Sequence, residues 1–311
     1  MRRDAEYELR EEVMSISPIE ETAGGLRLKR DDLLTAFGSS GPNGDKLLQA
    51  WAIVNNAAKA RSGFATGVIT ACSVHSPQSA IAAAVAWAYD LPCTIYFGTS
   101  SDSALKHVMP RVARAFGAEF EQLACARHNY MQLKLSEIAA NTGKVLIRYG
   151  MGGDLGPQHF IVARQTDNLP RDIDTLAVTC GSATTLTGIM LGIAQRKLRH
   201  IRRVIALGTA PNRRSQLNAA KAAIACETDW RDIYGLEIEY HDMHSEKGFV
   251  YEKGLQGVRV GEAALHPQYE AKAWAKLQQL KDWDPARTLF WIVGKEIKEA
   301  DRYGIFDSDR D

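Results

Sequence analysis

Short apolar runs alternate with longer segments of helical spacing along this chain, and that alternation constrains the fold more than any other sequence feature. The apolar runs, which we expect to be strands, span 65–72, 92–97, 144–149, 175–180, 204–207 and 288–293. Between them, the spacing predicts helices over 47–61, 79–89, 105–116, 133–140, 185–195, 215–226 and 269–280, with Gly117 ending the third. Strands separated by helices pair in parallel, so the sequence predicts an α/β fold with mainly parallel sheets.

Length and composition predict two globular domains. The 311 residues correspond to about two domains, at roughly 150 residues each. Hydrophobic residues make up 45% of the chain and charged residues 24%, which excludes a disordered or coiled-coil protein. No linker rich in Pro, Gly or Ser separates two halves, so we expect the domains to interleave. With 38 basic and 37 acidic residues the net charge is +1, which gives no global attraction to nucleic acid or membrane.

The sequence shows no targeting signal, membrane segment or metal-binding motif, and these absences set our expectations for cellular location and metal content. The opening segment MRRDAEYELREE has no apolar core, so no secretory signal is expected. The longest apolar run, 80–89, is far shorter than the roughly 18 residues of a membrane helix. Five scattered cysteines without a CxxC pair indicate neither disulfides nor structural zinc, and favour the cytoplasm. His241 and His244 form an HxxH pair without a nearby third ligand, so we expect no metal site.

Three loops follow predicted strands, where open parallel sheets bind ligands. They span 73–78, 150–156 and 181–188. The last belongs to TCGSATTLTG, whose small residues and hydroxyls lead into a helix and suit a phosphate. A tight turn with a Ser/Thr cap explains that segment equally well. The segment GMGGDLG, 150–156, lacks the GxGxxG spacing, which disfavours a dinucleotide site and indicates a loop.

Charged segments have simpler explanations. We expect RLKRDD, 27–32, to be a solvated, salt-bridged strand end. The basic segments 196–203 and 213–214 have no interleaved aromatic residues, so they are expected to be solvated helix ends. Lys46 differs, because GPNGDK places it at a helix start, where the helix dipole favours the neutral amine that a nucleophile needs. An exposed surface lysine remains the simpler alternative.

Together these segments resemble the fold type II, tryptophan-synthase-β-like, pyridoxal-phosphate enzymes, and most of all aminocyclopropane-carboxylate deaminase and D-cysteine desulfhydrase. Seven segments match family motifs in the family's order. They are SPIEETAGGLRLKRDDL, GPNGDKLLQAW, VITACSVHSPQSAIAAAVAWAYDLP, YGMGGDLG, TCGSATTLTGIMLGI, HPQYEAKAW and TLFWIVGK. The resemblance implies two interleaved three-layer α/β domains: a large one of residues 1–50 and 165–311, and a small one of residues 51–164.

The resemblance also implies roles for individual residues. Lys46 would hold the aldehyde of pyridoxal 5'-phosphate and move a proton, with Ser76 and Tyr269 as further catalytic residues and Tyr251 as a weaker candidate. The remaining cofactor-binding positions are His75, Gln78, Gly181, Ser182, Ala183, Thr184, Thr185 and Glu262. The resemblance further implies a homodimer and a small amine or amino-acid substrate.

Departures from the family motifs bear on the substrate. Pro77 occupies the position of the Asn that would hold the cofactor's phenolic oxygen, and Val293 that of the Thr that would face its pyridine nitrogen. The resemblance implies a lyase or deaminase acting on an amino-acid-like amine. Pro77 has no N–H to donate, so we expect weak turnover of aminocyclopropane-carboxylate and D-cysteine.

Two alternatives stay open. The first is a pyridoxal-phosphate enzyme that modifies an amino-acid-decorated nucleotide or DNA base, as virus-encoded relatives of this fold are associated with DNA hypermodification. The second is a non-catalytic binding module on the same fold, against which the retained Lys46 argues.

Overall fold

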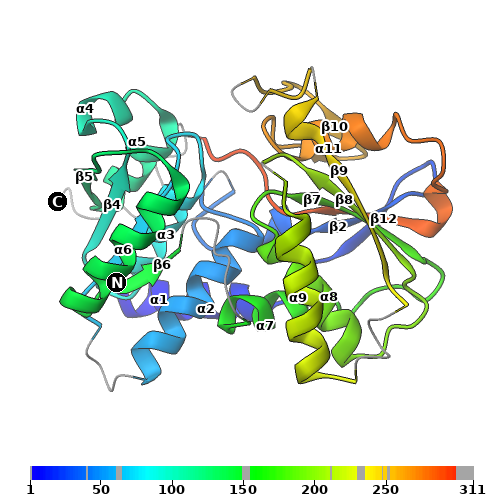
Figure 1. The fold of residues 1–311 in the computed structure, drawn as a ribbon, viewed down its shortest axis with the longest axis horizontal. Helices are drawn as coiled ribbons and strands as arrows, with labels where there is room; N and C mark the ends of the chain where they lie inside the picture. Colours follow the sequence, from blue (N-terminus) through cyan, green and yellow to red (C-terminus); the bar gives the residue numbers. More distant parts are fainter. Residues whose placement is uncertain are drawn as a thin grey trace. The chain divides into compact units, whose positions relative to one another are not determined.

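The computed structural model describes residues 2–39, 41–60, 65–148, 155–210, 212–229, 235–246, 248–250 and 253–298. The chain divides into two compact units, each with its own parallel sheet (Figure 1). Unit 1 contains residues 1–15, 34–152 and 297–311, and unit 2 contains residues 16–33 and 153–296. The chain therefore passes between the units several times, and each unit is built from separate stretches of sequence. No described helix has both the length and the apolar character needed to cross a membrane.

Unit 1 is a four-stranded parallel sheet in the order β5-β4-β3-β6. Its strands are β3 (Val68–Ala71), β4 (Cys93–Phe97), β5 (Glu119–Gln122) and β6 (Val145–Ile147). Its helices are α1 (Arg2–Met14), α2 (Asp45–Ala60), α3 (Gln78–Ala88), α4 (Ser101–Ala104), α5 (Val108–Ala115) and α6 (His128–Thr142).

Helices cover both faces of this sheet. The alanine-rich α3 is buried along almost its whole length and packs on β3 and β4, with α2 and α5 beside it. On the other face, α6 contributes Met131 and Leu135 to a core shared with Ile69 and Ala71 of β3. Successive residues of β3 point to opposite faces and all are buried, as expected of a strand between two helical layers.

Unit 2 is a six-stranded sheet in the order β1-β2-β12-β7-β8-β9, and only β1 runs antiparallel. The strands are β1 (Ile19–Glu21), β2 (Arg27–Arg30), β7 (Thr175–Cys180), β8 (Arg203–Gly208), β9 (Glu237–Asp242) and β12 (Thr288–Ile292), and a separate hairpin is formed by β10 (Arg259–Val260) and β11 (Ala263–Ala264). The helices are η1 (Asp31–Leu33), α7 (Pro157–Arg164), α8 (Thr184–Gln195), α9 (Arg214–Glu227), η3 (Met243–Ser245), α11 (Glu270–Leu277) and η4 (Pro285–Arg287).

Unit 2 also has three layers. On one face α11 packs Ala271, Ala273 and Leu277 against Ile205 and Phe290 of the sheet. On the other, α7 and α8 lie so close that a Cβ on Gly188 would stand 2.5 Å from the Cβ of Val162. Only glycine therefore fits at that crossing. The expected α/β class, with two interleaved three-layer domains and mainly parallel sheets, is confirmed.

The six apolar runs all form strands, and the seven predicted helices all form within a few residues of the expected bounds. Gly117 follows α5 with φ +80°, as expected of a residue that ends a helix. The expected domain boundaries differ from the two compact units. A boundary after residue 50 would cut α2, which runs unbroken to Ala60 and packs on α3 and β6 in unit 1. Residues 157–164 form α7, which packs on α8 in unit 2.

The segment 27–32, expected to be solvated, is instead buried from Leu28 to Asp32, so that expectation is wrong. Lys29 is 0% exposed, and its Nζ donates hydrogen bonds to the carbonyl oxygen of Ser17 and to Asn168 Oδ1, each at 2.7 Å. Asp31 is also 0% exposed and accepts hydrogen bonds from Ser17 Oγ at 2.5 Å and from Trp291 Nε1 at 2.6 Å. Buried charges persist when partners compensate them, and these partners come from distant parts of the chain.

The pKa values of this pair reflect that burial. Burial lowers the pKa of Lys29 to about 8, although the negative charges of Asp31 and Asp167 oppose the change. Burial raises the pKa of Asp31, and the charge of Lys29 opposes that shift. Each charge thus offsets part of the desolvation penalty of the other.

We predict that Lys29→Met and Asp31→Asn each lower the free energy of unfolding by about 3–5 kcal/mol, because each leaves an uncompensated buried group. The double variant is expected to lose less than the sum of the two, with a coupling of about 1–3 kcal/mol. Urea unfolding followed by circular dichroism measures all three changes. Single variants within about 1 kcal/mol of the parent, or strictly additive losses, would contradict this prediction.

Candidate active site

The predicted site residues divide between the two compact units, and each group is described within its own unit. Unit 1 holds Lys46, His75, Ser76 and Gln78, and unit 2 holds the segment Gly181–Thr185, Glu262 and Tyr269. In both units most of these residues lie beyond the carboxyl ends of parallel strands, where such sheets place their ligand sites.

Lys46 is the second residue of α2 and is half-buried. The turn before it is fixed by Gly44, whose φ of +75° suits glycine and whose N–H donates to the carbonyl of Leu34 at 3.0 Å. Asn43 Nδ2 closes the same turn on the carbonyl of Gly41 at 2.8 Å. The helix start predicted for Lys46 is therefore confirmed.

The Lys46 ammonium lies within electrostatic reach of the end of β3. Burial raises the pKa of the Cys72 thiol to about 12, and the positive charge of Lys46 acts in the opposite direction. Cys72 is the first residue after β3 and begins the loop that carries His75, Ser76 and Gln78. The charge of Lys46 therefore acts on the residue that begins this loop.

Residues 76–78 of that loop have no backbone N–H that is free for a ligand. The N–H of Ser76 donates to the carbonyl of Ser73 at 3.0 Å, and the N–H of Gln78 donates to Ser76 Oγ at 3.3 Å. Between them Pro77, the N-cap of α3, has no N–H. The Gln78 side chain points into the sheet, where Nε2 donates to Thr70 Oγ1 at 2.7 Å and to the carbonyl of Arg148 at 3.0 Å. Gln78 is thus 2% exposed and anchors the loop.

The segment Gly181–Thr185 connects β7 to α8, as expected. Ala183 is the N-cap of α8 and adopts φ +69°, a left-handed conformation that is costly for alanine. A Cβ on Gly181 would meet no atom within 4 Å, so the space beside it is open. Ser182 Oγ and Thr184 Oγ1 are 3.0 Å apart, which brings two hydroxyls together at the positive end of a helix of 12 residues. Such a segment suits an anion.

Two buried hydroxyls at this sheet edge were missed from the sequence. Thr179, in β7, and Thr209, directly after β8, are 5% and 2% exposed, and within the described residues their Oγ1 atoms have no hydrogen-bond partner. Buried polar groups are nearly always paired, so these hydroxyls point to a ligand. The rule that selected the other loops also selects Thr209, since it follows a strand.

Arg213 was expected to be a solvated helix end, and that expectation is wrong. It is half-buried, and its Nε donates to the carbonyl of Gly181 at 3.1 Å. Its N–H donates to the hydroxyl of Tyr240 at 3.2 Å, which fixes the backbone at the start of α9. A guanidinium therefore lies beside the segment Gly181–Thr185.

Tyr269 immediately precedes α11, and its ring contacts that of His266, with the ring centres 4.8 Å apart. Its neighbour Glu270 is 1% exposed and was missed from the sequence, although it lies in the matched segment HPQYEAKAW. Lys272, further along α11, donates to the carbonyl of Val250 at 2.7 Å. Val250 lies beyond the end of β9, so α11 begins near the carboxyl edge of the sheet.

Glu262 has a different setting. It lies in the turn of the β10–β11 hairpin, where its side chain is 95% exposed and 3.7 Å from Arg259. Its cofactor role stays a prediction, and a buried carboxylate such as Glu270 is better suited to a charged ring nitrogen. Tyr251 and residues 150–154 of GMGGDLG lie outside the described residues.

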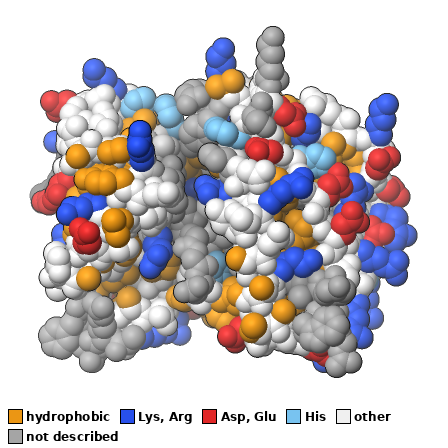
Figure 2. Space-filling view, in the orientation of Figure 1, with side chains coloured by type: hydrophobic (Ala, Val, Ile, Leu, Met, Phe, Trp, Pro, Cys, Tyr) orange, Lys and Arg blue, Asp and Glu red, His pale blue; other side chains and the backbone are white. Residues whose placement is uncertain are grey.

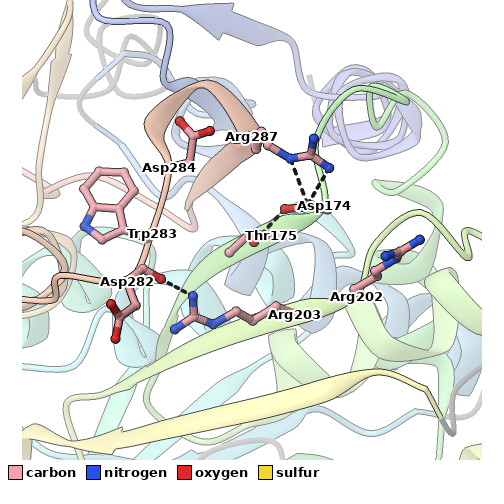
Figure 3. A pocket seen from close by; sticks show the side chains of 8 residues that line it. All are labelled: Asp174, Thr175, Arg202, Arg203, Asp282, Trp283, Asp284 and Arg287. Atoms are coloured by element: carbon pink, nitrogen blue, oxygen red, sulfur yellow. Dashed lines mark hydrogen bonds and ion pairs between the residues drawn. The ribbon is translucent and has the colours of Figure 1, made fainter.

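A cavity of about 440 Å³ opens at the opposite edge of the unit 2 sheet, beside the amino ends of β7 and β8 (Figure 3). Two of its basic side chains already bind other residues that line the cavity. Arg287 binds Asp174 with an N–O distance of 2.6 Å, and Arg203 donates to the carbonyl of Asp282. The cavity therefore lies away from the segment Gly181–Thr185.

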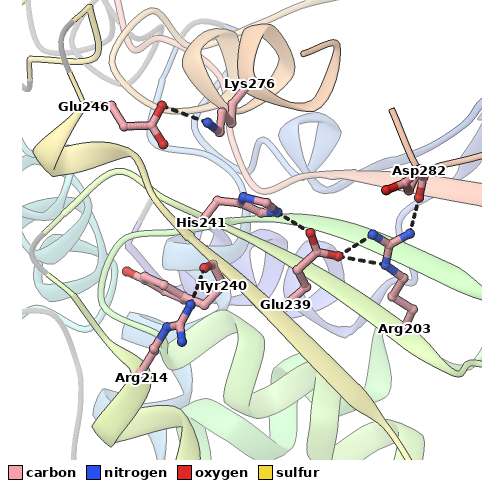
Figure 4. Close-up of polar contacts among 8 residues, drawn as sticks. All are labelled: Arg203, Arg214, Glu239, Tyr240, His241, Glu246, Lys276 and Asp282. Atoms are coloured by element: carbon pink, nitrogen blue, oxygen red, sulfur yellow. Dashed lines mark hydrogen bonds and ion pairs between the residues drawn. The ribbon is translucent and has the colours of Figure 1, made fainter. Parts of the chain in front are cut away.

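His241 belongs to a chain of ion pairs along β9 (Figure 4). Its Nε2 lies 2.7 Å from Glu239 Oε1, and Arg203 Nε donates to Glu239 Oε2 at 2.9 Å. Hydrogen bonds from Arg203 and its charge lower the pKa of Glu239, although partial burial opposes them. In the described part of the chain, no group of three or more His, Cys, Asp or Glu side chains could hold a metal ion.

Comparisons with known proteins support the resemblance. No family model matches the chain. The O-seryl-dTMP PLP-dependent decarboxylase of Salmonella phage ViI is 24% identical over 339 aligned positions, covering 89% of this chain and 79% of the phage protein.

Solved structures match over nearly the whole chain. A homologue of ACC deaminase has a TM-score of 0.67 at 19% identity, covering 94% of this chain and 95% of the other. O-acetylserine-dependent cystathionine β-synthase from Helicobacter pylori has a TM-score of 0.62 at 13% identity, covering 96% and 98%. A pyridoxal 5'-phosphate-dependent aspartate racemase has a TM-score of 0.61 at 12% identity and covers 97% of both chains. The chain therefore has the fold of the fold type II, tryptophan-synthase-β-like, pyridoxal-phosphate enzymes.

Proposed function

We propose that this protein is a pyridoxal-phosphate-dependent decarboxylase that acts on an amino acid attached to a nucleotide. The observation that carries the proposal is the loop after β3, in which residues 76–78 have no N–H left to offer a carboxylate. The relative that acts on O-seryl-dTMP supports the nucleotide part of the substrate.

The residues of unit 2 suit the phosphate and the ring nitrogen of the cofactor. Gly181–Thr185 offers open space, two adjacent hydroxyls and a helix start to a phosphate group. Thr179 and Thr209 add buried hydroxyls at the same edge, and Glu270 adds a buried carboxylate for the ring nitrogen. When bound, pyridoxal phosphate supplies an electron sink for charge that develops at the α-carbon.

Lys46 is the residue proposed to hold the cofactor covalently. Its amine could also carry a proton to the α-carbon of the substrate. In the overall reaction the bond between the α-carbon and the carboxylate breaks, carbon dioxide leaves, and a proton takes its place on the α-carbon. Tyr269 is a second candidate for delivering that proton.

The loop after β3 favours this outcome electrostatically. A carboxylate loses its negative charge as it becomes carbon dioxide, so N–H donors that bind it stabilise the starting state more than the transition state. In this chain those donors are taken up within the loop or absent at Pro77. Carboxylate loss is therefore less opposed than on a loop with free N–H groups.

A deaminase or lyase acting on a free amino acid is the second candidate, which the likeness of fold to an ACC deaminase homologue favours. A DNA-linked substrate and a non-catalytic binding module remain further alternatives. The homodimer stays a prediction.

The test of function uses protein loaded with pyridoxal phosphate and O-seryl-dTMP labelled in the carboxyl carbon. We expect labelled carbon dioxide at about 1 per second or faster, together with the amine product, and little ketoacid from aminocyclopropane-carboxylate or D-cysteine. Lys46→Ala is expected to abolish both carbon dioxide release and the lysine adduct trapped by borohydride. Lys59→Ala, at an exposed position on the same helix, is the control. Rapid ketoacid release from a free amino acid, without decarboxylation, would favour the deaminase instead.

Restoring a donor to the loop tests the electrostatic argument. Pro77→Asn supplies an N–H and a side-chain amide at the N-cap of α3, where Asn is a favoured residue. We expect decarboxylation to slow by about tenfold, because one added hydrogen bond to a carboxylate stabilises the starting state by about 1.5 kcal/mol or more. The ratio of decarboxylation to α-proton exchange, measured in deuterated water, should fall with it. An unchanged ratio would contradict the role of the loop.

Arg213 is expected to strengthen phosphate binding in unit 2. Arg213→Gln should raise the Kd of pyridoxal phosphate by about tenfold, through loss of one charge-assisted contact. The Kd of pyridoxal, which has no phosphate, should change by less than about twofold. Arg214→Gln is the matched control, because Arg214 donates to the carbonyl of Tyr240 instead of Gly181. Equal losses for both ligands would indicate a structural role for Arg213.

A further inference from the structure

Four basic side chains gather beside the loop after β3 in unit 1. His75, in that loop, and His107, the N-cap of α5, meet edge to face with their ring centres 4.7 Å apart. Lys106 precedes His107 and is exposed. Arg111, one turn into α5, donates to the carbonyls of Lys106 at 3.1 Å and Leu105 at 3.5 Å. We call these four residues the His75–His107 cluster.

The charges in this cluster repel one another. Burial lowers the pKa of His107, and the nearby charges of His75, Arg111 and Lys106 lower it further. The three groups whose charges lower the pKa of His107 are all basic. Like charges held together cost free energy, and an anion placed among them would turn that repulsion into attraction.

The cluster also has the geometry of an anion site. His107 lies at the start of a helix of eight residues, and its ring makes no capping hydrogen bond within the described residues. The helix start adds partial positive charge, and two half-buried imidazoles and a lysine can each donate a charge-assisted hydrogen bond. These donors come from the loop after β3 and from the turn between α4 and α5, and both segments belong to unit 1.

The cluster shares its loop with the proposed active site. His75 is three residues beyond Cys72, which the charge of Lys46 reaches, and it directly precedes Ser76. A single ligand with two ionic groups could therefore use both Lys46 and this cluster. An amino acid alone offers only its carboxylate, whereas a nucleotide-linked amino acid carries a separate phosphate.

We propose that the His75–His107 cluster binds the phosphate of the substrate's nucleotide and so selects nucleotide-linked over free amino acids. This inference rests on the proposed function and names the residues that recognise the nucleotide part of its substrate. It also reassigns His75 from the cofactor to the substrate.

A mononucleotide fits better than DNA. The chain's net charge is +1, and on the face shown in Figure 2 basic and acidic side chains are interspersed. Binding to duplex DNA normally draws on many phosphate contacts from an extended basic surface. Four basic groups in one place match a single phosphate monoester.

The test measures binding directly, with dTMP and thymidine as probes of protein loaded with pyridoxal phosphate. We expect dTMP to bind at least tenfold more tightly than thymidine. The double variant His75→Asn/His107→Asn should raise the Kd of dTMP at least tenfold and leave that of thymidine within about twofold. Asn is a good N-cap, so α5 should persist at His107→Asn. His200→Asn, in the loop before β8, is the control.

Further measurements separate this proposal from its alternatives. Imidazole ¹⁵N shifts of His75 and His107 should move with dTMP and stay in place with thymidine. Equal binding of dTMP and thymidine to a protein that decarboxylates O-seryl-dTMP would overturn the phosphate site and leave the proposed function standing. If dTMP binds more tightly than thymidine but O-seryl-dTMP is not decarboxylated, the phosphate site would be supported and the proposed decarboxylase function would be overturned. Loss of bound cofactor in His75→Asn would show that His75 binds the cofactor and would overturn its role in substrate binding. Tighter binding of duplex DNA than of dTMP would overturn the proposal that the site binds a mononucleotide.

Discussion

Strand β12 holds unit 2 together, because it pairs in parallel with β2 on one side and with β7 on the other. It is the last strand of the described chain, yet it occupies the middle of the sheet, with all five residues buried. Its Trp291 donates a hydrogen bond to Asp31, which lies just beyond β2. The sheet therefore cannot close until segments about 260 positions apart meet, and the buried Lys29 and Asp31 lie at that junction.

The same arrangement brings several segments to one edge of the sheet. Parallel strands end together, so the loops after β7 and β8 lie side by side, as shown by the bond from the Thr209 N–H to the carbonyl of Cys180 at 3.0 Å. Arg213 reaches Gly181 across that edge. The strained Ala183 is held there by a strand that pairs with β12 and β8 before it, and by a buried helix after it. The framework thus supplies the rigidity that an anion-binding segment needs.

Unit 1 also holds a rigid loop at the carboxyl edge of its sheet, but this loop offers fewer hydrogen-bond donors. The loop after β3 is held by hydrogen bonds to itself and to the sheet, so its conformation is set before any ligand binds. A preformed loop with few free N–H groups binds a carboxylate weakly and costs little to order. The neighbouring His75 and His107 offer imidazole nitrogens to an anion instead. Under the proposed function, this unit would recognise a second anionic group of the substrate more than its carboxylate.

The sequence by itself determined the α/β class, the main strands and helices, and the positions of Lys46 and Gly181–Thr185. Those features depend on local rules: hydrophobic period, glycine turns and helix starts that follow strands. The sequence also supported the resemblance to fold type II enzymes, because motifs and their order along the chain can be recognised without knowing which residues are in contact.

Only the tertiary structure decided which charged residues are buried and what they bind. The segment 27–32 reads as a solvated strand end, because nothing local indicates that Trp291 and Asn168 will compensate its charges. The roles of Arg213 and Glu270 were hidden for the same reason: one depends on a contact across two strands and the other on the packing of α11. The pairing of His75 with His107 likewise required β3 and β4 to be neighbours. Burial and long-range pairing are properties of the packed chain, and no local pattern encodes them.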